Sequence, residues 1–321
     1  MLPLILIVLT VFCAFMNGFT DAPNSLANCV MTRCLHPKTA MLIGAVSNFL
    51  GVIISAKIAK SVSQTVFLLA GLHNDNSSAE ITAICCSILS VIMFATLAWY
   101  FAIPTSESHA LIAAVSGASF ALYGKICTSA WCNVISGVLL SVVLGFVVSF
   151  CLSSITIRLM RNVASHKANN FFKNSQIVSA VLCAVMHGVQ DGVKLCSIIL
   201  IVLPNFKHST IIIGCAMSTG TLFGAGRIMK NVGEGFARLK LFQGANADFA
   251  SFISLSVSTV LGLPVSTSHI KTSALCGSAA QKNIHRVNWK TAGEMLLAWI
   301  ITFPFCFLLS YILTAIIIRG N

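Results

Sequence analysis

Long apolar stretches separated by short polar segments run through nearly the whole chain. Backbone polar groups find no partner in lipid, so a stretch of about 20 apolar residues predicts a membrane-spanning helix. Several stretches are shorter than that, which predicts broken or re-entrant helices within the membrane. The continuous runs do not match the alternation, over about ten residues, of a membrane β-barrel. The apolar stretches cover roughly residues 2–19, 39–56, 62–72, 81–103, 109–123, 131–157, 175–203, 209–224, 246–262, 268–281 and 291–318.

The composition strengthens this interpretation. Of the 321 residues, 57% are hydrophobic and only 9% are charged, against about 25% charged residues in ordinary soluble domains. So little charge excludes a soluble globular protein and a disordered chain. We predict an all-α fold, a polytopic integral membrane protein in which residues 1–16 belong to a retained helix, because no basic segment marks a signal peptide. The 13 cysteines show no C-x-x-C spacing and are expected to be small buried hydrophobes.

Basic residues predict which ends of the helices face the cytoplasm. The formal net charge is +12, and eleven of the 20 Lys and Arg residues lie in the segments 158–173, 227–240 and 282–290. Cytoplasmic loops carry such an excess, so we expect these segments in the cytoplasm. A site for anionic lipid or a partner is the alternative. The predicted regions are an N-terminal transmembrane repeat over 1–157, a basic cytoplasmic linker over 158–174 and a C-terminal transmembrane repeat over 175–321.

Two motifs occur twice in the same order, once in each half. Residues 16–22 (MNGFTDA) correspond to 186–192 (MHGVQDG), and residues 103–109 (IPTSESH) correspond to 263–269 (LPVSTSH). A glycine follows eight residues after the histidine of each second motif. Chance explains such a double match poorly, so the chain is predicted to be a duplicated unit. The basic residues predict inverted halves with both termini outside, as in many secondary transporters; Lys57 and Lys60 fit this orientation less well.

Asp21 and Asp191 occupy matching positions of the first motif within apolar surroundings. A carboxylate at membrane depth costs about 2.5–3.5 kcal/mol on insertion scales, so it usually has a function. In the first copy, Gly18 and Pro23 are expected to interrupt the helix. The break would expose backbone groups beside the side chains of Thr20, Asn24 and Ser25, which suit a small cation or an oxyanion. The alternative is a Pro-kinked packing helix that Asp21 caps.

The second motif predicts the start of a helix in both copies. Proline is favoured in the first turn of a helix, and serine and threonine are favoured at its N-cap. A helix that begins inside the membrane presents free N–H groups and the positive end of its dipole, which bind anions. Simple capping at the membrane interface is the alternative. The hydroxyl residues concerned are Ser106, Ser108, Ser266, Thr267 and Ser268.

Several further polar residues lie in apolar contexts. Lys194 follows Asp191 by three residues and shares its helix face, so it neutralises Asp191 in a structural ion pair or contacts an anion. His109 and His269 are expected to support the second motif. The sequence does not separate the roles of Glu107, Lys271, Asp248 and Glu294. No nucleotide-binding or nucleic-acid pattern is present.

With these motifs the chain resembles the inorganic phosphate transporter (PiT) family, also called the Pho4 family. The resemblance rests on residues 17–25, 187–194 and 262–269, with further similarity over 32–37 and 48–51 and over 226–233. It spans nearly the whole chain. Both asparagines of the family signature are replaced, by Thr20 and Gln190, and Val193 stands where glutamine is usual. These departures bear on the choice of cation and oxyanion.

The resemblance implies a bound phosphate held between the two half-helix regions, with Na⁺ or H⁺ carried alongside and no cofactor. We therefore expect cation ligands at Asp21, Asp191 and Asn17, with Na⁺ at the two aspartates, and supporting roles for His109, His187 and His269. The expected phosphate-binding residues are Thr20, Asn24, Ser25, Ser106, Ser108, Gln190, Lys194, Ser266, Thr267 and Ser268.

The sequence thus predicts a secondary active transporter of inorganic phosphate, coupled to Na⁺ or H⁺, that works by alternating access. Moving one negative charge into a cell that is 100 mV negative costs about 2.3 kcal/mol, so uptake requires accompanying cations. We expect a multi-pass protein of a prokaryotic plasma membrane that contacts lipid and no nucleic acid. The sequence leaves a homodimer open.

Alternative functions use the same polar residues. A sulfate or other oxyanion permease of the same fold is the first, and a channel or sensor is the second. An intramembrane aspartyl protease also needs two aspartates within the membrane. The protease fits poorly because the aspartates are symmetric repeat elements and the G-x-G-D pattern is missing. No enzymatic activity is therefore expected.

Overall fold

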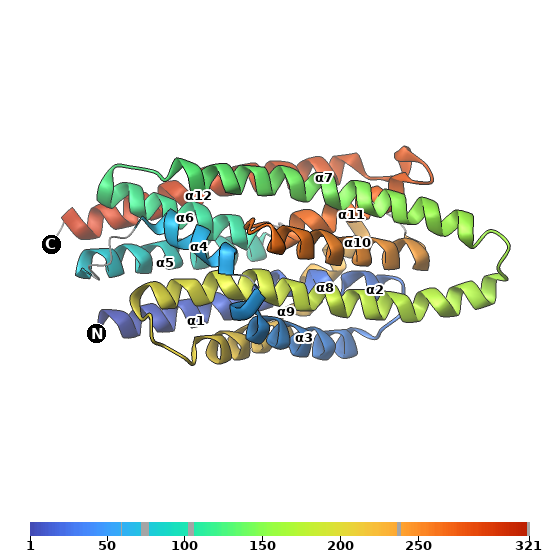
Figure 1. Ribbon diagram of the computed structural model, residues 1–321, viewed down its shortest axis with the longest axis horizontal. Coiled ribbons are helices and arrows are strands. Elements are labelled where there is room, and N and C mark those ends of the chain that lie inside the picture. Colours follow the sequence, from blue (N-terminus) through green and yellow to red (C-terminus); the bar gives the residue numbers. More distant parts are fainter. Residues whose placement is uncertain (59, 72–76, 102–105, 236–238, 320–321) are drawn as a thin grey trace.

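The computed structural model describes residues 1–58, 60–71, 77–101, 106–235 and 239–319. The described residues form a bundle of helices that lie along one long axis (Figure 1). The helices are α1 (Leu2–Thr20), α2 (Ala27–Met31), α3 (Pro37–Ile58), α4 (Lys60–Ala70), α5 (Ser78–Tyr100), α6 (Glu107–Tyr123), α7 (Thr128–Leu159), α8 (Ser165–Val202), α9 (Ser209–Gly235), α10 (Leu241–Val260), α11 (Thr267–Ala280) and α12 (Trp289–Arg319), with 3₁₀ turns η1 (Ala22–Ser25) and η2 (Ile284–Arg286). The predicted all-α fold is confirmed.

Six helical segments of the described chain are long and apolar enough to cross a membrane. The shorter helices α6 and α11, of 17 and 14 residues, begin in the interior of the bundle. Broken helices were therefore rightly predicted from the short apolar stretches. The spanning segments are Leu2–Ser25, Pro37–Lys57, Ser78–Tyr100, Thr128–Leu159, Ser165–Val202 and Trp289–Ile318.

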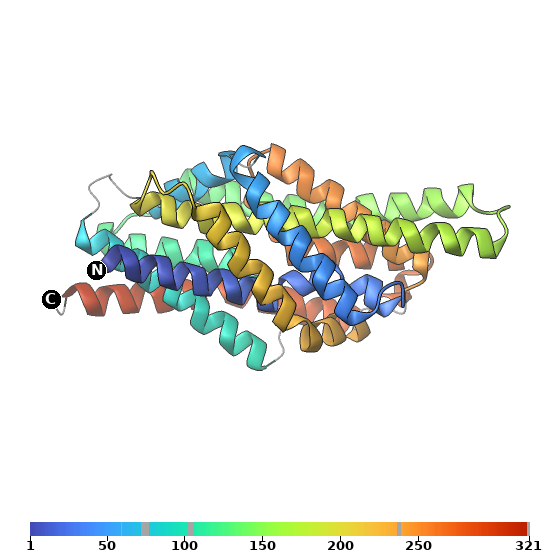
Figure 2. The same cartoon turned by 90° about the horizontal axis from the view of Figure 1, so that it is seen from below.

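The two halves run in opposite directions. Figure 1 shows α1 running from the N-terminus toward the centre, whereas its counterpart α8 runs toward the end at which the chain starts. Both termini lie at this end, and the α7–α8 turn and η2 lie at the other (Figures 1 and 2). Two of the three basic segments thus share the end opposite the termini, as the inverted repeat requires. The stretch 158–174 covers the end of α7, the turn and the beginning of α8.

The halves interlock rather than pack as separate bodies. Four of the five most extensive helix pairs join one half to the other: α1 with α9, α3 with α8, α6 with α12, and α7 with α11. Paired glycines permit this close approach, because a Cβ at Gly117 or Gly277 would lie 2.2 Å from the carbonyl oxygen of Phe307 or Phe146, respectively. These are the glycines that follow each second motif, so their recurrence in the sequence reflects helix packing.

The two copies of the first motif differ in backbone. The chain leaves the α-helix at Asp21 and enters η1, in which Pro23 lacks the N–H that would continue the helix. The corresponding residue of α8 is Val193, and α8 continues unbroken through Asp191. The interruption expected in the first copy is therefore present, and the second copy has no corresponding break.

Candidate functional site

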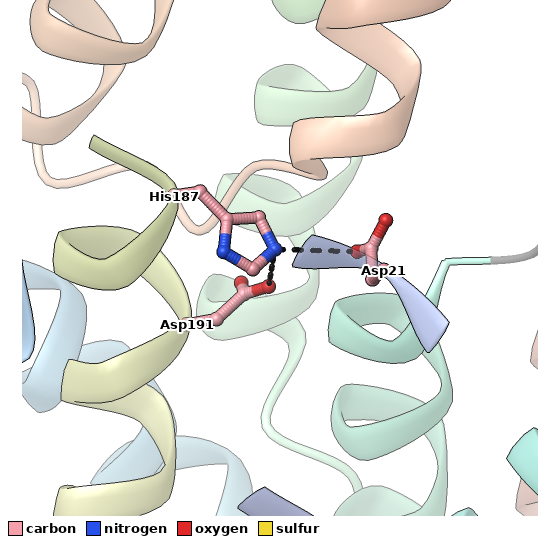
Figure 3. Close-up of side chains that lie close together, drawn as sticks. All are labelled: Asp21, His187 and Asp191. Carbon is pink, nitrogen blue, oxygen red and sulfur yellow. Dashed lines mark ion pairs between the residues drawn. The ribbon is translucent and has the colours of Figure 1, made fainter. Parts of the chain in front are cut away.

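Asp21 and Asp191 meet in the interior, with His187 between them (Figure 3). His187 Nε2 lies 3.8 Å from Asp21 Oδ2 and 3.4 Å from Asp191 Oδ2. All three side chains are buried, and one ligand atom from each lies within 4.8 Å of the others. His187 Nδ1 donates a hydrogen bond of 3.1 Å to Asn48 Oδ1 of α3, which fixes the imidazole ring. The duplicated aspartates thus form one site.

Each aspartate is held by the half-helix of the opposite repeat. Ser268 Oγ of α11 donates to Asp21 Oδ1 at 2.6 Å, and Ser108 Oγ of α6 donates to Asp191 Oδ1, also at 2.6 Å. Thr267 Oγ1 donates to Asp21 Oδ2 at 3.2 Å. The predicted cation ligands and the predicted anion-binding hydroxyls therefore contact each other directly.

The residue three positions after each aspartate distinguishes the two copies. Asn24 Nδ2 donates to Asp21 Oδ1 at 3.0 Å, and Lys194 Nζ donates to Asp191 Oδ1 at 3.0 Å. The lysine ammonium also contacts Ser108 Oγ at 2.7 Å and is fully buried. A neutral amide in one copy thus takes the place of an ammonium in the other.

Lys194 links three elements of the site. Besides Asp191 and Ser108, its ammonium donates to the backbone carbonyl of Val265, just before α11, at 2.8 Å. A buried lysine needs such partners, because desolvation of an unpaired charge is costly. The Lys194–Asp191 ion pair, one of the two roles predicted for Lys194, is present. The ammonium also lies beside the first turn of α6.

Glu107 adds a third carboxylate. It is buried at the first position of α6 and accepts a hydrogen bond from Thr20 Oγ1. Asn17 Nδ2 donates to Asp191 Oδ2 at 3.2 Å. Glu107, Asn17 and Asp191 line a cavity of about 10 Å³, which is room for about one water molecule. The sequence did not assign Glu107 a role, although its place between Ser106 and Ser108 in the duplicated motif was a usable signal.

Some predicted site residues lie outside this network. Gln190 Nε2 donates to Thr259 of α10 at 2.8 Å, so this amide points away from the aspartates. The backbone carbonyl of Ser25, rather than its hydroxyl, accepts from Lys271 at 3.0 Å. Ser106 and Ser266 act as N-caps, each accepting from the backbone N–H three residues later at 3.3 Å.

His109 and His269 pack against each other, with ring centroids 4.4 Å apart and a T-shaped arrangement. Both are buried where α6 and α11 begin. Phe303 stacks on His109 at 4.8 Å, and Trp299 lies 3.6 Å from the ring centre of His269. The pair therefore joins the two half-helices in a mainly apolar contact. Pro104 and Thr105 lie outside the described residues.

A second buried ion pair lies next to the site and was missed by sequence reasoning. Lys271 of α11 pairs with Asp248 of α10, and Asn28 Nδ2 of α2 donates to Asp248 Oδ1 at 2.6 Å. Asp248 and Lys271 have no charged counterparts in the first half, where Ile88 and Leu111 stand. The duplicated motifs therefore gave no signal for this pair.

The donor set suits a hard cation. Carboxylate, hydroxyl and amide oxygens are the ligands that such ions prefer. The buried amide oxygens of Asn17 and Asn24 accept no hydrogen bond from the described residues. A Na⁺ ion beside Asp21 or Asp191 has oxygens of all three kinds within its surroundings, so these residues fit the predicted ion.

Charge within the site also favours cations. Asp21, Asp191 and Glu107 bring three carboxylates, and Lys194 brings one ammonium. With His187 neutral, the formal sum is −2 when all carboxylates are ionised. An oxyanion at the first turns of α6 and α11 would add further negative charge, which a low-dielectric interior tolerates only with compensating cations.

Comparisons with known proteins agree with this architecture. A family model described as the phosphate transporter family matches twice, over residues 17–169 and 156–310. A probable low-affinity inorganic phosphate transporter of Bacillus subtilis is 33% identical over 317 residues and covers 94% of both chains. Its counterpart in Rhizobium meliloti is 32% identical over 326 residues and covers 95% of this chain and 93% of its own.

A solved structure described as the sodium-dependent phosphate transporter has the same fold. It superposes with a TM-score of 0.87 at 18% identity and covers 100% of both chains. The two family matches correspond to the two inverted halves, and the relatives are transporters rather than enzymes. The resemblance inferred from the motifs is thereby confirmed, and this multi-pass membrane protein belongs to the phosphate transporter family.

Proposed function

We propose that this protein carries inorganic phosphate across the plasma membrane together with Na⁺, by alternating access of the Asp21–Asp191 site. The observation that carries the proposal is the crossed contact of Ser108 with Asp191 and of Ser268 with Asp21. Each hydroxyl can donate either to its aspartate or to a phosphate oxygen, but not to both. The arrangement therefore links the state of the carboxylates to phosphate binding.

Cation binding releases the donors that phosphate needs. A Na⁺ ion that binds the carboxylate oxygens of Asp21 competes for the acceptors of Ser268 and Thr267. The freed hydroxyls, together with the N–H groups in the first turns of α6 and α11, then face the anion. Because the coupling is thermodynamic, phosphate must raise the affinity for Na⁺ by the same factor. A solved structure of this fold is described as the sodium-dependent phosphate transporter, which supports Na⁺ over H⁺.

Glu107 favours phosphate over sulfate. Its carboxylate lines the small cavity beside Ser108 and Lys194. Phosphate at neutral pH carries at least one O–H group that donates to such an acceptor, whereas sulfate carries none and meets only repulsion. The names of the Bacillus subtilis and Rhizobium meliloti relatives point to the same substrate.

The inverted repeat allows access to the same site from either end of the bundle. The half-helices α6 and α11 begin at the centre and run toward opposite ends of the bundle (Figure 1). Related packings of the two halves therefore open the site first to one end and then to the other. The end with the basic α7–α8 turn faces the cytoplasm by the positive-inside rule, and the termini face outside.

Uptake of radiolabelled phosphate by purified protein in proteoliposomes tests this function. An inward Na⁺ gradient should drive saturable accumulation, an equal choline gradient should not, and sulfate in excess should compete weakly. Asp21→Asn should abolish accumulation, whereas Glu294→Gln, an exposed carboxylate on α12, should keep it. Uptake that ignores the Na⁺ gradient, or that sulfate blocks as well as phosphate does, contradicts the proposal.

A further inference from the structure

A second, larger cavity lies between α3, α4, α8 and α9. Its volume is about 560 Å³, and it is lined by both exposed and buried residues. Gln64, Asn205 and Lys207 form the exposed rim, and Val193, Cys196 and Ser197 of α8 form the buried floor. The cavity therefore leads from the surface toward α8.

We propose that this cavity is the outer vestibule through which phosphate reaches the site, and that a contact between Ser63 and Ser197 closes its floor. The inference rests on the proposed function and adds the route by which the anion enters. A vestibule at this place requires three properties: a lining that suits an oxyanion, a floor next to the site, and a closure that can open.

The lining suits an oxyanion. The described residues that line the cavity include one ammonium, on Lys207, and no carboxylate. The serine and threonine hydroxyls and the amides of Gln64 and Asn205 add neutral donors. A cavity lined by one sign of charge raises the local concentration of the opposite ion. The lining therefore attracts anions without binding them strongly, as a route to a deeper site requires.

The floor adjoins the site through α8. Val193 directly precedes Lys194, whose buried ammonium contacts Asp191 and Ser108. Cys196 belongs to the hydrophobic core and also lines the cavity floor. Residues of the cavity floor and a residue that contacts Asp191 are therefore neighbours on α8.

At the cavity floor, a hydroxyl contact joins α4 to α8. Ser197 Oγ donates its one proton either to Ser63 Oγ of α4, at 2.7 Å, or to the Val193 carbonyl, at 2.6 Å. The intrahelical partner keeps Ser197 satisfied when α4 moves away. Helix α4 has 11 residues and does not span the membrane, so its displacement disrupts less packing than that of a full-length helix.

The position of the cavity also accounts for a departure from the charge rule. The α8–α9 loop, which carries Lys207, lies at the end of the bundle that holds both termini (Figure 1). Lys57, which fits the predicted orientation poorly, directly follows Ala56 of the cavity lining. Basic residues are less frequent in outer segments, and a requirement to collect anions there explains their presence.

Transport kinetics test the lining. Lys207→Gln should raise the KM for phosphate about 3- to 10-fold and keep the maximal rate, because the charge only concentrates the anion. The effect should shrink as choline chloride raises the ionic strength, since screening shortens the reach of the charge. Lys125→Gln is the matched control, because Lys125 is exposed in the α6–α7 loop and does not line the cavity. An equal KM for Lys207→Gln and Lys125→Gln overturns the assignment.

Labelling of Cys196 tests the closure. In intact cells, a membrane-impermeant methanethiosulfonate should modify Cys196 slowly, and Ser63→Ala should raise the rate about 5-fold, the factor that a lost hydrogen bond typically contributes. Ser141→Ala is the control, because that hydroxyl bonds the Val138 carbonyl of its own helix, away from the cavity. Cys196→Ser should remove the labelled peptide. Labelling of Cys196 that proceeds only from the cytoplasmic side of inverted vesicles contradicts an outer vestibule.

Inorganic phosphate and a lipid headgroup offer the same oxyanion, so the labelling is repeated on purified protein in vesicles of defined lipid composition. Slower labelling of Cys196 on addition of inorganic phosphate in pure phosphatidylcholine supports the vestibule. Protection that appears only with phosphatidylglycerol, and that phosphate does not change, identifies a headgroup site and overturns the route. If Asp21→Asn abolishes uptake while the Lys207→Gln kinetics and the Cys196 labelling both fail, the vestibule is rejected and the proposed function remains. If phosphate uptake is absent but phosphate still protects Cys196, the vestibule stands and the transport proposal fails.

Discussion

The two aspartates occupy matching positions but different surroundings. Asp21 lies where α1 ends and is bound by neutral donors: Asn24, Thr267 and Ser268. Asp191 lies inside a continuous helix and pairs with the Lys194 ammonium. An aspartate with neutral partners keeps its charge available for a mobile cation, whereas one that is paired with lysine is already compensated. We therefore infer that exchange of Na⁺ centres on Asp21, and that Asp191 anchors the site.

The largest effect on stability is expected for Asp191→Asn. The substitution leaves the Lys194 ammonium buried without its anionic partner, which typically costs about 3–5 kcal/mol. A thermal unfolding assay in detergent should show a strong loss for this variant. The double variant Asp191→Asn/Lys194→Met should regain most of the lost stability and still fail to transport phosphate. A single variant as stable as the unmodified protein contradicts the anchoring role.

Asp21→Asn should abolish Na⁺-driven uptake with a smaller loss of stability. The hydrogen-bond donors to Asp21 are the neutral groups of Asn24, Thr267 and Ser268, so replacing the carboxylate strands no buried lysine. Hydrogen bonds to a charged group contribute about 1.5–3 kcal/mol, part of which the asparagine retains. Unfolding and uptake measured on the same preparations check this. Greater instability for Asp21→Asn than for Asp191→Asn reverses the comparison.

Asn24→Lys should make the two copies alike. The new ammonium would stand beside Asp21 as Lys194 stands beside Asp191, and would compete with the cation. Loss of about 1.4 kcal/mol of cation binding raises the Na⁺ concentration for half-maximal uptake tenfold. The conservative change Asn24→Gln serves as the control. An unchanged Na⁺ dependence in Asn24→Lys indicates that the cation binds elsewhere.

The smallest effects are expected for the crossed hydroxyls. Ser108→Ala and Ser268→Ala each remove one short hydrogen bond to a carboxylate and one donor for phosphate. A lost hydrogen bond of about 1–1.5 kcal/mol corresponds to a rise in phosphate KM of roughly tenfold. The two variants should behave alike if the hydroxyls have matching roles. A rise in one variant and none in the other shows that only one half-helix contacts the anion.

Much of this site was predictable from the sequence because it depends on duplicated motifs. The repeats predicted that Asp21 and Asp191 belong together and that α6 and α11 begin near them. They did not predict that each half-helix would hold the aspartate of the other half, because this depends on how α1 packs with α9 and α3 with α8. Long-range packing of that kind leaves no local signal in the sequence.

Other differences arise from single residues whose environment the motif does not specify. Gln190 has a longer side chain than Thr20 and reaches Thr259 of α10 instead of the site. Glu107 belongs to the site because it contacts Thr20, and the sequence gives no indication of this contact. The Lys271–Asp248 pair occurs in one half only, so comparison of the repeats had nothing to match it with.

Binding of phosphate to the purified protein at a series of Na⁺ concentrations tests the central claim most directly. If Na⁺ on the aspartates frees the hydroxyls for the anion, phosphate affinity must rise with Na⁺, and Na⁺ affinity must rise with phosphate by the same factor. Asp21→Asn should remove this mutual dependence. Phosphate binding of equal strength with and without Na⁺ in the unmodified protein would contradict the account.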